Sequence, residues 1–170
     1  DQVTVKSNDE PIRYFGGDSE SFEKSSMVRA RVIAQTLAGL IKQADNIFIM
    51  GHKQSDFDSF GASIALYALC RAYDKTAYII INYDSLEEKT AAVAKTLVDD
   101  ERYRDVFISA DYAHEIVSPG SLLVAVDNHK PSLAIDENIL DIINNKVVID
   151  HHRRGEEFID LPLLTYLEPA

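Results

Sequence analysis

The chain has 170 residues, of which 46% are hydrophobic and 26% are charged, and its formal net charge at pH 7 is −11. This length allows one domain with a sizeable core, and the acidic balance argues against non-specific nucleic-acid binding through a broad basic surface. No apolar run approaches the roughly 20 residues that a membrane-spanning helix needs, residues 1–20 do not read as a signal peptide, and the single Cys70 cannot form an internal disulfide.

The chain begins with a segment that differs from the rest. Residues 1–20 hold a strand-like alternation and then a polar stretch with Pro11 and two adjacent glycines, which predicts the end of a preceding domain and a linker. Because the chain opens on Asp1 rather than Met, we expect it to be part of a longer protein. Apolar residues at helical spacing then predict a long amphipathic helix over residues 21–44.

Strands and helices are predicted to alternate over the remainder. We expect strands at 47–50, 76–81, 106–109, 122–126, 147–149 and 163–167, and helices at 59–73, 85–98, 112–117 and 135–143. Continuous apolar strands of this kind suit a sheet that is covered on both faces. The sequence therefore predicts a doubly wound α/β domain with a mostly parallel sheet of about five or six strands and helices on both faces.

Imidazole and carboxylate side chains follow three of these strands directly. The three motifs, in order, are Gly51-His52-Lys-Gln-Ser-Asp56-Phe-Asp58, then Asp127, then Asp150-His151-His152. In a parallel sheet the carboxyl ends of the strands meet at one edge, where ligands bind. We therefore expect the three motifs to converge.

Mixed imidazole and carboxylate ligands suit Mn²⁺, Fe²⁺ or Zn²⁺, and no thiolate is available here. The candidate ligands are His52, Asp56, Asp58, Asp127 and His151. Because five ligands exceed what one tetrahedral ion uses, we predict a two-metal cluster, with Mn²⁺ as first choice. Two such ions share a bridging carboxylate and generate a bridging hydroxide, which would be the nucleophile on a phosphoryl group.

Several carboxylates in these motifs have an ordinary structural alternative. Asp127 alone could cap a helix or serve a turn, and Asp58 could cap the helix that follows it. Neither reading explains His52 or two adjacent histidines after an apolar strand. We expect Asp150, which lies next to the sheet, to orient a ligating imidazole rather than to reach a metal.

Other polar residues beside the strand ends have two readings each. We expect His152 to point away from His151 and either to contact phosphate or to be a core histidine. Arg153 and Arg154 could donate to phosphate or be solvated loop charges, and His129 could have a phosphate-side role. Together with Lys53 and Lys130, the two arginines form a local basic cluster that could offset the acidic net charge. His114 has no suitable polar neighbours in the sequence and is taken as structural, and the acidic run at 99–101 as a solvated helix end.

These motifs resemble those of the DHH phosphoesterase superfamily over about residues 45–170. The fuller stretches at 51–62, Val126-Asp-Asn-His-Lys-Pro-Ser132 and Asp150-His-His-Arg-Arg-Gly155 are similar to the GdpP-type cyclic-di-AMP phosphodiesterases. The resemblance implies that residues 1–20 are the tail of a degenerate GGDEF-like domain and a linker. Residues 21–170 would then be the DHH domain with its leading helix, ending before a DHH-associated domain.

The resemblance also implies a mechanism and a setting. The enzyme would use two Mn²⁺ ions to open cyclic-di-AMP to linear pApA, with His52 and Asp56 on one ion, Asp58 and His151 on the other, and Asp127 bridging. Catalytic roles would fall to Asp127, His151 and His152, and substrate contacts to His129, Arg153 and Arg154. The parent would be anchored in a bacterial membrane and act on its cytoplasmic side, this segment would itself be soluble, and a homodimer is one assembly to consider.

The chain departs from the family pattern in two ways. The further Asp ligand that the family carries downstream of the Asp-His-His motif is not matched here, since Asp160 lies in no corresponding motif. The resemblance also implies a DHH-associated domain that grips the nucleotide, and we expect the 170 residues to lack it. We therefore expect the 170-residue chain to bind metal incompletely and to turn over substrate poorly.

Other readings remain open at this point. Within the superfamily they are a RecJ-type exonuclease, for which the acidic chain lacks a DNA-binding groove, a short-RNA or pApA hydrolase, and an inorganic pyrophosphatase. A different class is a non-catalytic metal- or nucleotide-binding regulatory module. The intact set of candidate ligands argues against that class, because a degenerate site would be expected to lose some of them.

Overall fold

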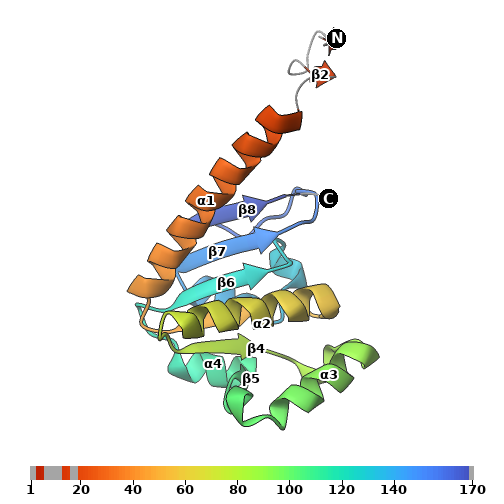
Figure 1. Ribbon diagram of the computed structural model, residues 1–170. Helices are drawn as coiled ribbons and strands as arrows, with labels where there is room; N and C mark the ends of the chain where they lie inside the picture. Colours follow the sequence, from red (N-terminus) through yellow and green to blue (C-terminus); the bar gives the residue numbers. More distant parts are fainter. Residues whose placement is uncertain (1–2, 6–12, 16–18, 169–170) are drawn as a thin grey trace. The chain divides into compact units, whose positions relative to one another are not determined.

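The computed structural model describes residues 3–5, 13–15 and 19–168, with side chains described from residue 27 onward (Figure 1). Its contacts divide the chain into two compact units, residues 1–35 and 36–170. In the first unit, β1 (Val3–Val5) pairs antiparallel with β2 (Arg13–Phe15). The long helix α1 (Ser19–Gln43) matches the expected amphipathic helix. The domain boundary expected near residue 20 stays a prediction.

The second unit contains a six-stranded sheet in which every neighbouring pair is parallel. Its strands are β3 (Ile47–Met50), β4 (Ala77–Ile80), β5 (Phe107–Ile108), β6 (Leu122–Val126), β7 (Asn145–Asp150) and β8 (Leu164–Leu167). The order across the sheet is β5-β4-β3-β6-β7-β8. Over the described residues, no helix combines the length and apolarity needed to cross a bilayer.

Helices cover both faces of this sheet, which confirms the predicted doubly wound fold (Figure 1). Ile47 and Ile49 belong to a core shared with α1 and α2 (Phe57–Ala72). Phe48 and Met50 face the opposite core, shared with α4 (Ala110–Ile116) and α5 (Glu137–Ile142). The alternation follows from the two-residue period of a strand, and it explains why β3 is apolar at every position.

Several boundaries differ from the expected ones for local reasons. The helix expected at 85–98 is divided into the 3-10 turn η1 (Tyr83–Ser85) and α3 (Glu88–Val98), because residues 86 and 87 are extended. The helix expected from residue 135 begins only after Asp136, whose side chain accepts from the N–H of Asn138 and caps α5. Two further 3-10 turns are η2 (Glu101–Tyr103) and η3 (Pro131–Leu133).

The strand order places the site. After β3 the chain moves to β4 and β5 on one side, and then returns through β6, β7 and β8 on the other. The order therefore reverses between β3 and β6, and such a switch point leaves a crevice at the carboxyl ends of the two strands. The first motif leaves β3 and the second leaves β6, so the sheet itself brings them together.

Candidate metal centre

The first motif is a tight connection from β3 to α2. Gly51 lies between them, and a Cβ at this position would stand 2.1 Å from the Oγ of Ser59. Only a residue without a side chain lets the first turn of α2 approach the strand so closely. The loop is held from within by Ser55, whose hydroxyl donates to the carbonyl of His52 at 2.6 Å.

Asp56 both caps α2 and faces the site. Its Oδ1 accepts the backbone N–H groups of Asp58 and Ser59, each at 3.0 Å. The same oxygen lies 3.7 Å from Nε2 of His52. The helix cap is therefore Asp56, and the alternative reading of Asp58 as the cap is wrong. The capping bonds fix the position of the carboxylate that the sequence offers as a ligand.

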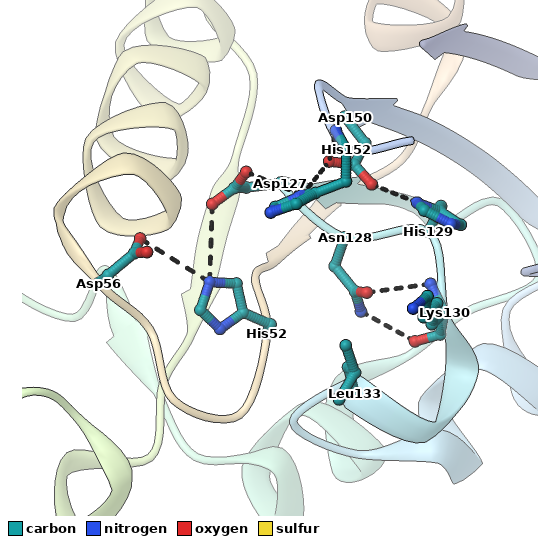
Figure 2. A pocket seen from close by; sticks show the side chains of 9 residues that line it. All are labelled: His52, Asp56, Asp127, Asn128, His129, Lys130, Leu133, Asp150 and His152. Atoms are coloured by element: carbon teal, nitrogen blue, oxygen red, sulfur yellow. Dashed lines mark hydrogen bonds and ion pairs between the residues drawn. The ribbon is translucent and has the colours of Figure 1, made fainter. Parts of the chain in front are cut away.

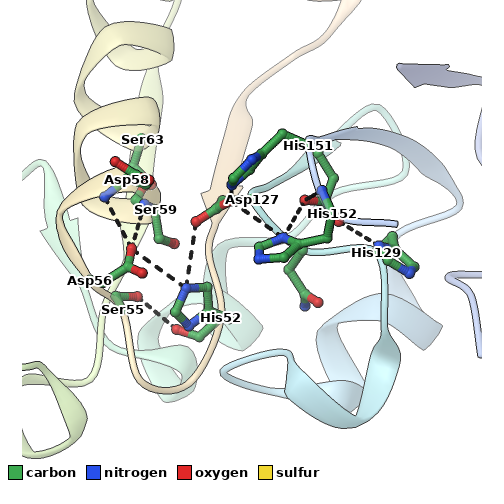
Figure 3. A network of polar contacts seen from close by, with 12 residues as sticks. His52, Ser55, Asp56, Asp58, Ser59, Ser63, Asp127, His129, His151 and His152 are labelled. Carbon is green, nitrogen blue, oxygen red and sulfur yellow. Dashed lines mark hydrogen bonds and ion pairs between the residues drawn. The ribbon is translucent and has the colours of Figure 1, made fainter. Parts of the chain in front are cut away.

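Asp127 occupies the centre of the site (Figure 3). It follows β6 directly, its φ is 55°, and its side chain is 5% exposed. Its Oδ2 lies 3.6 Å from Nε2 of His52, and its Oδ1 lies 3.1 Å from Nε2 of His151. Oδ1 nevertheless accepts no hydrogen bond from the part of the chain that the structure describes. Burying a carboxylate oxygen without a hydrogen bond costs free energy, and a cation bound beside this oxygen would offset that cost.

The third motif approaches Asp127 from β7. His151 and His152 are half-exposed, and their rings lie 4.5 Å apart between centroids. The Nδ1 of His152 is 3.6 Å from Oδ1 of Asp127. The expectation that His152 points away from His151 is therefore wrong: both rings lie on the side of Asp127. Their backbone turns where β7 ends, so the strict alternation of a strand no longer separates them.

The described residues form two groups whose ligand atoms lie within 4.8 Å of one another, and both groups contain Asp127. They are His52, Asp56 and Asp127, and Asp127, His151 and His152. A cavity of about 230 Å³ lies beside the first group and a second, of about 350 Å³, beside the other. Asp58 lines the second cavity together with Glu168 but is in neither group.

Asp150 and His129 are two buried residues beside the first donor group (Figure 2). Both residues are at least 95% buried. Oδ2 of Asp150 is 2.5 Å from Nδ1 of His129, and Oδ1 is 2.7 Å from Nδ1 of His152. Asp150 thus contacts two imidazoles, those of His129 and His152.

Comparison with known proteins now identifies the family. A family model for the DHH family, N-terminal domain, matches residues 46–170. The chain belongs to the DHH family.

Two relatives are similar over nearly the whole chain. The cyclic-di-AMP phosphodiesterase PdeA of Listeria monocytogenes is 39% identical, and the cyclic-di-AMP phosphodiesterase GdpP of Bacillus subtilis is 40% identical, each over 99% of this chain and 26% of the relative. The chain therefore spans about a quarter of the length of these relatives. Among solved structures, an exopolyphosphatase-related protein from Bacteroides fragilis aligns with a TM-score of 0.58 at 20% identity, over 79% of this chain and 39% of that one, which shows the shared fold.

The donor set fits the divalent cation that DHH phosphoesterases require. The carboxylate of Asp127 raises the pKa of His52 above its ordinary value, outweighing the partial burial of the ring and assisted by Asp56. Burial would raise the pKa of Asp150, but hydrogen bonds from His129 and His152 outweigh it and hold that pKa below its usual range. The cluster favours positive charge at its centre, as a cation site does.

The DHH-family site is braced by contacts that the sequence did not reveal. Ser132 donates through its N–H and its hydroxyl to the carboxylate of Glu157, both at 2.7 Å. The N–H of Lys53 donates to the carbonyl of Leu133 at 2.8 Å. These bonds join all three loops at η3. Polar residues at 132 and 157 are the only sequence signal, and spacing alone could not pair residues so far apart.

The remaining predicted residues lie around the rim or far away. Arg153 and Arg154 are exposed on the loop after His152, and the guanidinium of Arg154 lies over the Phe158 ring, 4.8 Å from its centroid. His114 does have a polar partner, contrary to expectation, because its Nε2 is 3.0 Å from Oδ2 of Asp136. That pair lies between α4 and α5 and takes no part in the site.

Proposed function

We propose that this chain supplies the metal-binding part of a phosphodiesterase that opens cyclic-di-AMP to linear pApA. The observation that supports a phosphoesterase reaction is the buried carboxylate of Asp127, which faces His52 with one oxygen and His151 with the other. The substrate is suggested by the relatives that are named cyclic-di-AMP phosphodiesterases and match 99% of the chain.

The two donor groups indicate how the residues would divide between two ions. His52 and Asp56 would hold one and His151 the other, with Asp127 shared between them. Asp58, which lines the adjoining cavity, would complete the second set. Imidazole and carboxylate donors favour Mn²⁺ over Mg²⁺. When bound, such a pair of cations would neutralise phosphoryl oxygens and lower the pKa of a bound water molecule toward neutral pH.

The chain's own residues would bind and orient the phosphate. Arg153, which is exposed on the loop after the histidines, would donate to a phosphate oxygen, and so would Arg154, whose guanidinium lies over the Phe158 ring. His152 presents its ring to the same side of Asp127 as His151. The two guanidinium groups would locally offset the acidic net charge of −11 at the point where an anion must enter.

The parent protein would carry further parts of the enzyme. Because the chain spans about a quarter of its relatives, we propose that a downstream Asp and a DHH-associated domain complete the metal site and grip the nucleotide. We also propose that the parent acts at the cytoplasmic face of a bacterial membrane. The 170-residue chain alone should then turn over cyclic-di-AMP poorly, and full turnover by this chain would contradict that proposal.

The proposed function is tested with the longer natural protein that contains this chain. It is incubated with Mn²⁺ and cyclic-di-AMP, with pApA and pyrophosphate in parallel, and the products are separated by chromatography. Linear pApA formed from the cyclic substrate would support the proposal. Metal binding with the cyclic dinucleotide left intact would refute it, and hydrolysis of pApA or pyrophosphate alone would point to another DHH phosphoesterase.

A further inference from the structure

His129 is a buried residue of the loop that follows β6, and both of its ring nitrogens contact other residues of the chain. The residue is 1% exposed. Its Nδ1 lies 2.5 Å from Oδ2 of Asp150, and its Nε2 accepts the N–H of Gly155 at 3.3 Å. Because Nε2 accepts, the ring carries its proton on Nδ1 and donates it to Asp150. Neither nitrogen is left for a substrate.

Asp150 passes this constraint on to His152. Its other oxygen, Oδ1, accepts the backbone N–H of His152 at 3.0 Å and the Nδ1–H of the same residue at 2.7 Å. The Asp150 side chain is 0% exposed, so water does not compete for its oxygens. His129 therefore fixes the orientation of the Asp150 carboxylate, and that carboxylate in turn fixes the orientation of the His152 ring (Figure 2).

His129 also anchors the loop that carries the histidines. The ring of Phe158 stacks on the imidazole with centroids 5.3 Å apart, and the N–H of Ile159 donates to the carbonyl of His129 at 2.8 Å. Ile159 is 1% exposed and lies in the core beneath the site. His129 thus contacts the loop after β7 through its ring face, its Nε2 and its carbonyl, and contacts the last residue of β7 through its Nδ1.

We propose that His129 is a positioning residue, which holds the His152 imidazole beside Asp127 through the Asp150 carboxylate and does not itself touch the substrate. This assignment replaces the substrate contact that the sequence suggested for His129. The positioning of His152 by His129 does not depend on the reaction catalysed, whereas the expected effect on turnover rests on the proposed function.

Two substitutions separate the hydrogen bond from the mere presence of a side chain. His129→Leu removes both nitrogens, whereas His129→Asn keeps a donor at the place of Nδ1, because the two nitrogens are the same number of bonds from Cα. His114→Leu is the matched control, since His114 also pairs with a carboxylate, that of Asp136, at 3.0 Å but away from the site.

The first measurement needs neither metal nor substrate. Long-range ¹H–¹⁵N spectra of the metal-free, histidine-labelled 170-residue chain report which nitrogen of each ring carries the proton. We expect Nδ1–H for His129 and His152 in the wild type, and loss of this single pattern for His152 in His129→Leu but not in His114→Leu. An unchanged His152 pattern in folded His129→Leu would overturn the proposal. If that variant does not fold, loss of the pattern in folded His129→Asn would overturn it instead.

The second measurement uses the longer natural protein with Mn²⁺ and cyclic-di-AMP. We expect kcat to fall about 10- to 100-fold in His129→Leu with KM nearly unchanged, as is typical when an outer partner of a site is lost, and to recover largely in His129→Asn. A raised KM with an unchanged kcat would mean that His129 binds substrate and would overturn the proposal. If the wild type does not turn over cyclic-di-AMP, the proposed function fails, and the His152 spectrum still decides the positioning role.

Discussion

At the scale of single residues, Asp127 differs from the other carboxylates of the site. Its backbone has φ 55°, a conformation that Asp and Asn adopt far more readily than other residues with a side chain. The conformation ends β6 and places the carboxylate between His52 and His151. The residue type is therefore required twice, once by the backbone and once by the ligand set.

Replacing Asp127 by Asn should separate these two requirements. Asn tolerates the positive φ, so the fold should persist, but it removes the shared negative charge. We expect the affinity for Mn²⁺ to fall by more than about 100-fold, because loss of even an outer partner costs about 10- to 100-fold. Isothermal titration measures this, with the exposed Asp111→Asn as control. Retained affinity in folded Asp127→Asn would refute the central role of this carboxylate.

Asp56 has two roles that a pair of variants can distinguish. Asn caps helices as well as Asp does, whereas Ala loses the capping bonds to Asp58 and Ser59. We expect Asp56→Ala to lose about 1 kcal/mol of unfolding free energy and Asp56→Asn to lose little. Both should bind Mn²⁺ more weakly than the wild type. Urea unfolding and metal titration measure the two effects, and equal stability losses in both variants would contradict the capping role.

At the scale of elements, the site depends on how closely α2 approaches the end of β3. Ser59 is 0% exposed, its side chain faces Gly51 across the junction, and its hydroxyl has no hydrogen-bond partner among the described residues. The contact therefore depends on shape rather than on a polar bond. A well-packed junction of this kind has no room for added atoms.

Gly51→Ala should destabilise the chain by about 1–3 kcal/mol, since its Cβ would overlap the Ser59 hydroxyl. Ser59→Ala alone should change stability little, because the hydroxyl makes no hydrogen bond to any residue that the structure describes. The double variant should recover most of the loss, since the Ser59 Cβ is 3.5 Å from the new methyl group. Urea unfolding of all four chains gives the coupling free energy. Additive effects would show that the overlap is not the cause.

At the scale of the whole domain, the sheet order and the loop contacts act together. The reversal between β3 and β6 brings the first two motifs to one crevice, and the bonds at Ser132 and Lys53 join the loops that surround it. On the face that carries α4 and α5, a second polar contact joins two helices through His114 and Asp136. That contact lies away from the candidate ligands and can be studied without metal.

The stability of the domain should depend on pH through Asp136. Burial would raise the pKa of Asp136, but hydrogen bonds from His114 and from the N–H of Asn138 outweigh it and place the pKa below the ordinary value of 3.8. A lowered folded-state pKa contributes stability that is complete above about pH 4 and is lost as pH falls through the folded value. Asp136→Asn should therefore be less stable than the wild type near neutral pH.

The difference in unfolding free energy between the wild type and Asp136→Asn should decrease below about pH 4, as the Asp136 carboxyl of the wild type takes up its proton. Urea midpoints measured from pH 7 downward, over the range in which both chains fold, give this profile. Asp111→Asn, an exposed change on α4, is the control. A stability difference that stays constant on acidification would show that the lowered pKa of Asp136 is not its cause.

Much of the fold could be predicted because its signals are local. A run such as Ile47–Met50 is apolar at every position, and it is followed by Gly51 and by apolar residues at helical spacing. Each signal needs only neighbours in the chain, and a parallel sheet then follows from their alternation. The same logic placed all three motifs at strand ends, and the two donor groups that share Asp127 lie there.

The sequence by itself determined the family, the α/β fold and the strand ends where the chemistry gathers, because motif spacing and apolar periodicity are properties of adjacent residues. Only the tertiary structure decided which side chains meet. The pairing of His129 with Asp150, of His114 with Asp136 and of Ser132 with Glu157 joins residues 21 to 25 positions apart. Such contacts depend on strand register and on the direction in which each loop leaves the sheet, and no local pattern encodes either one.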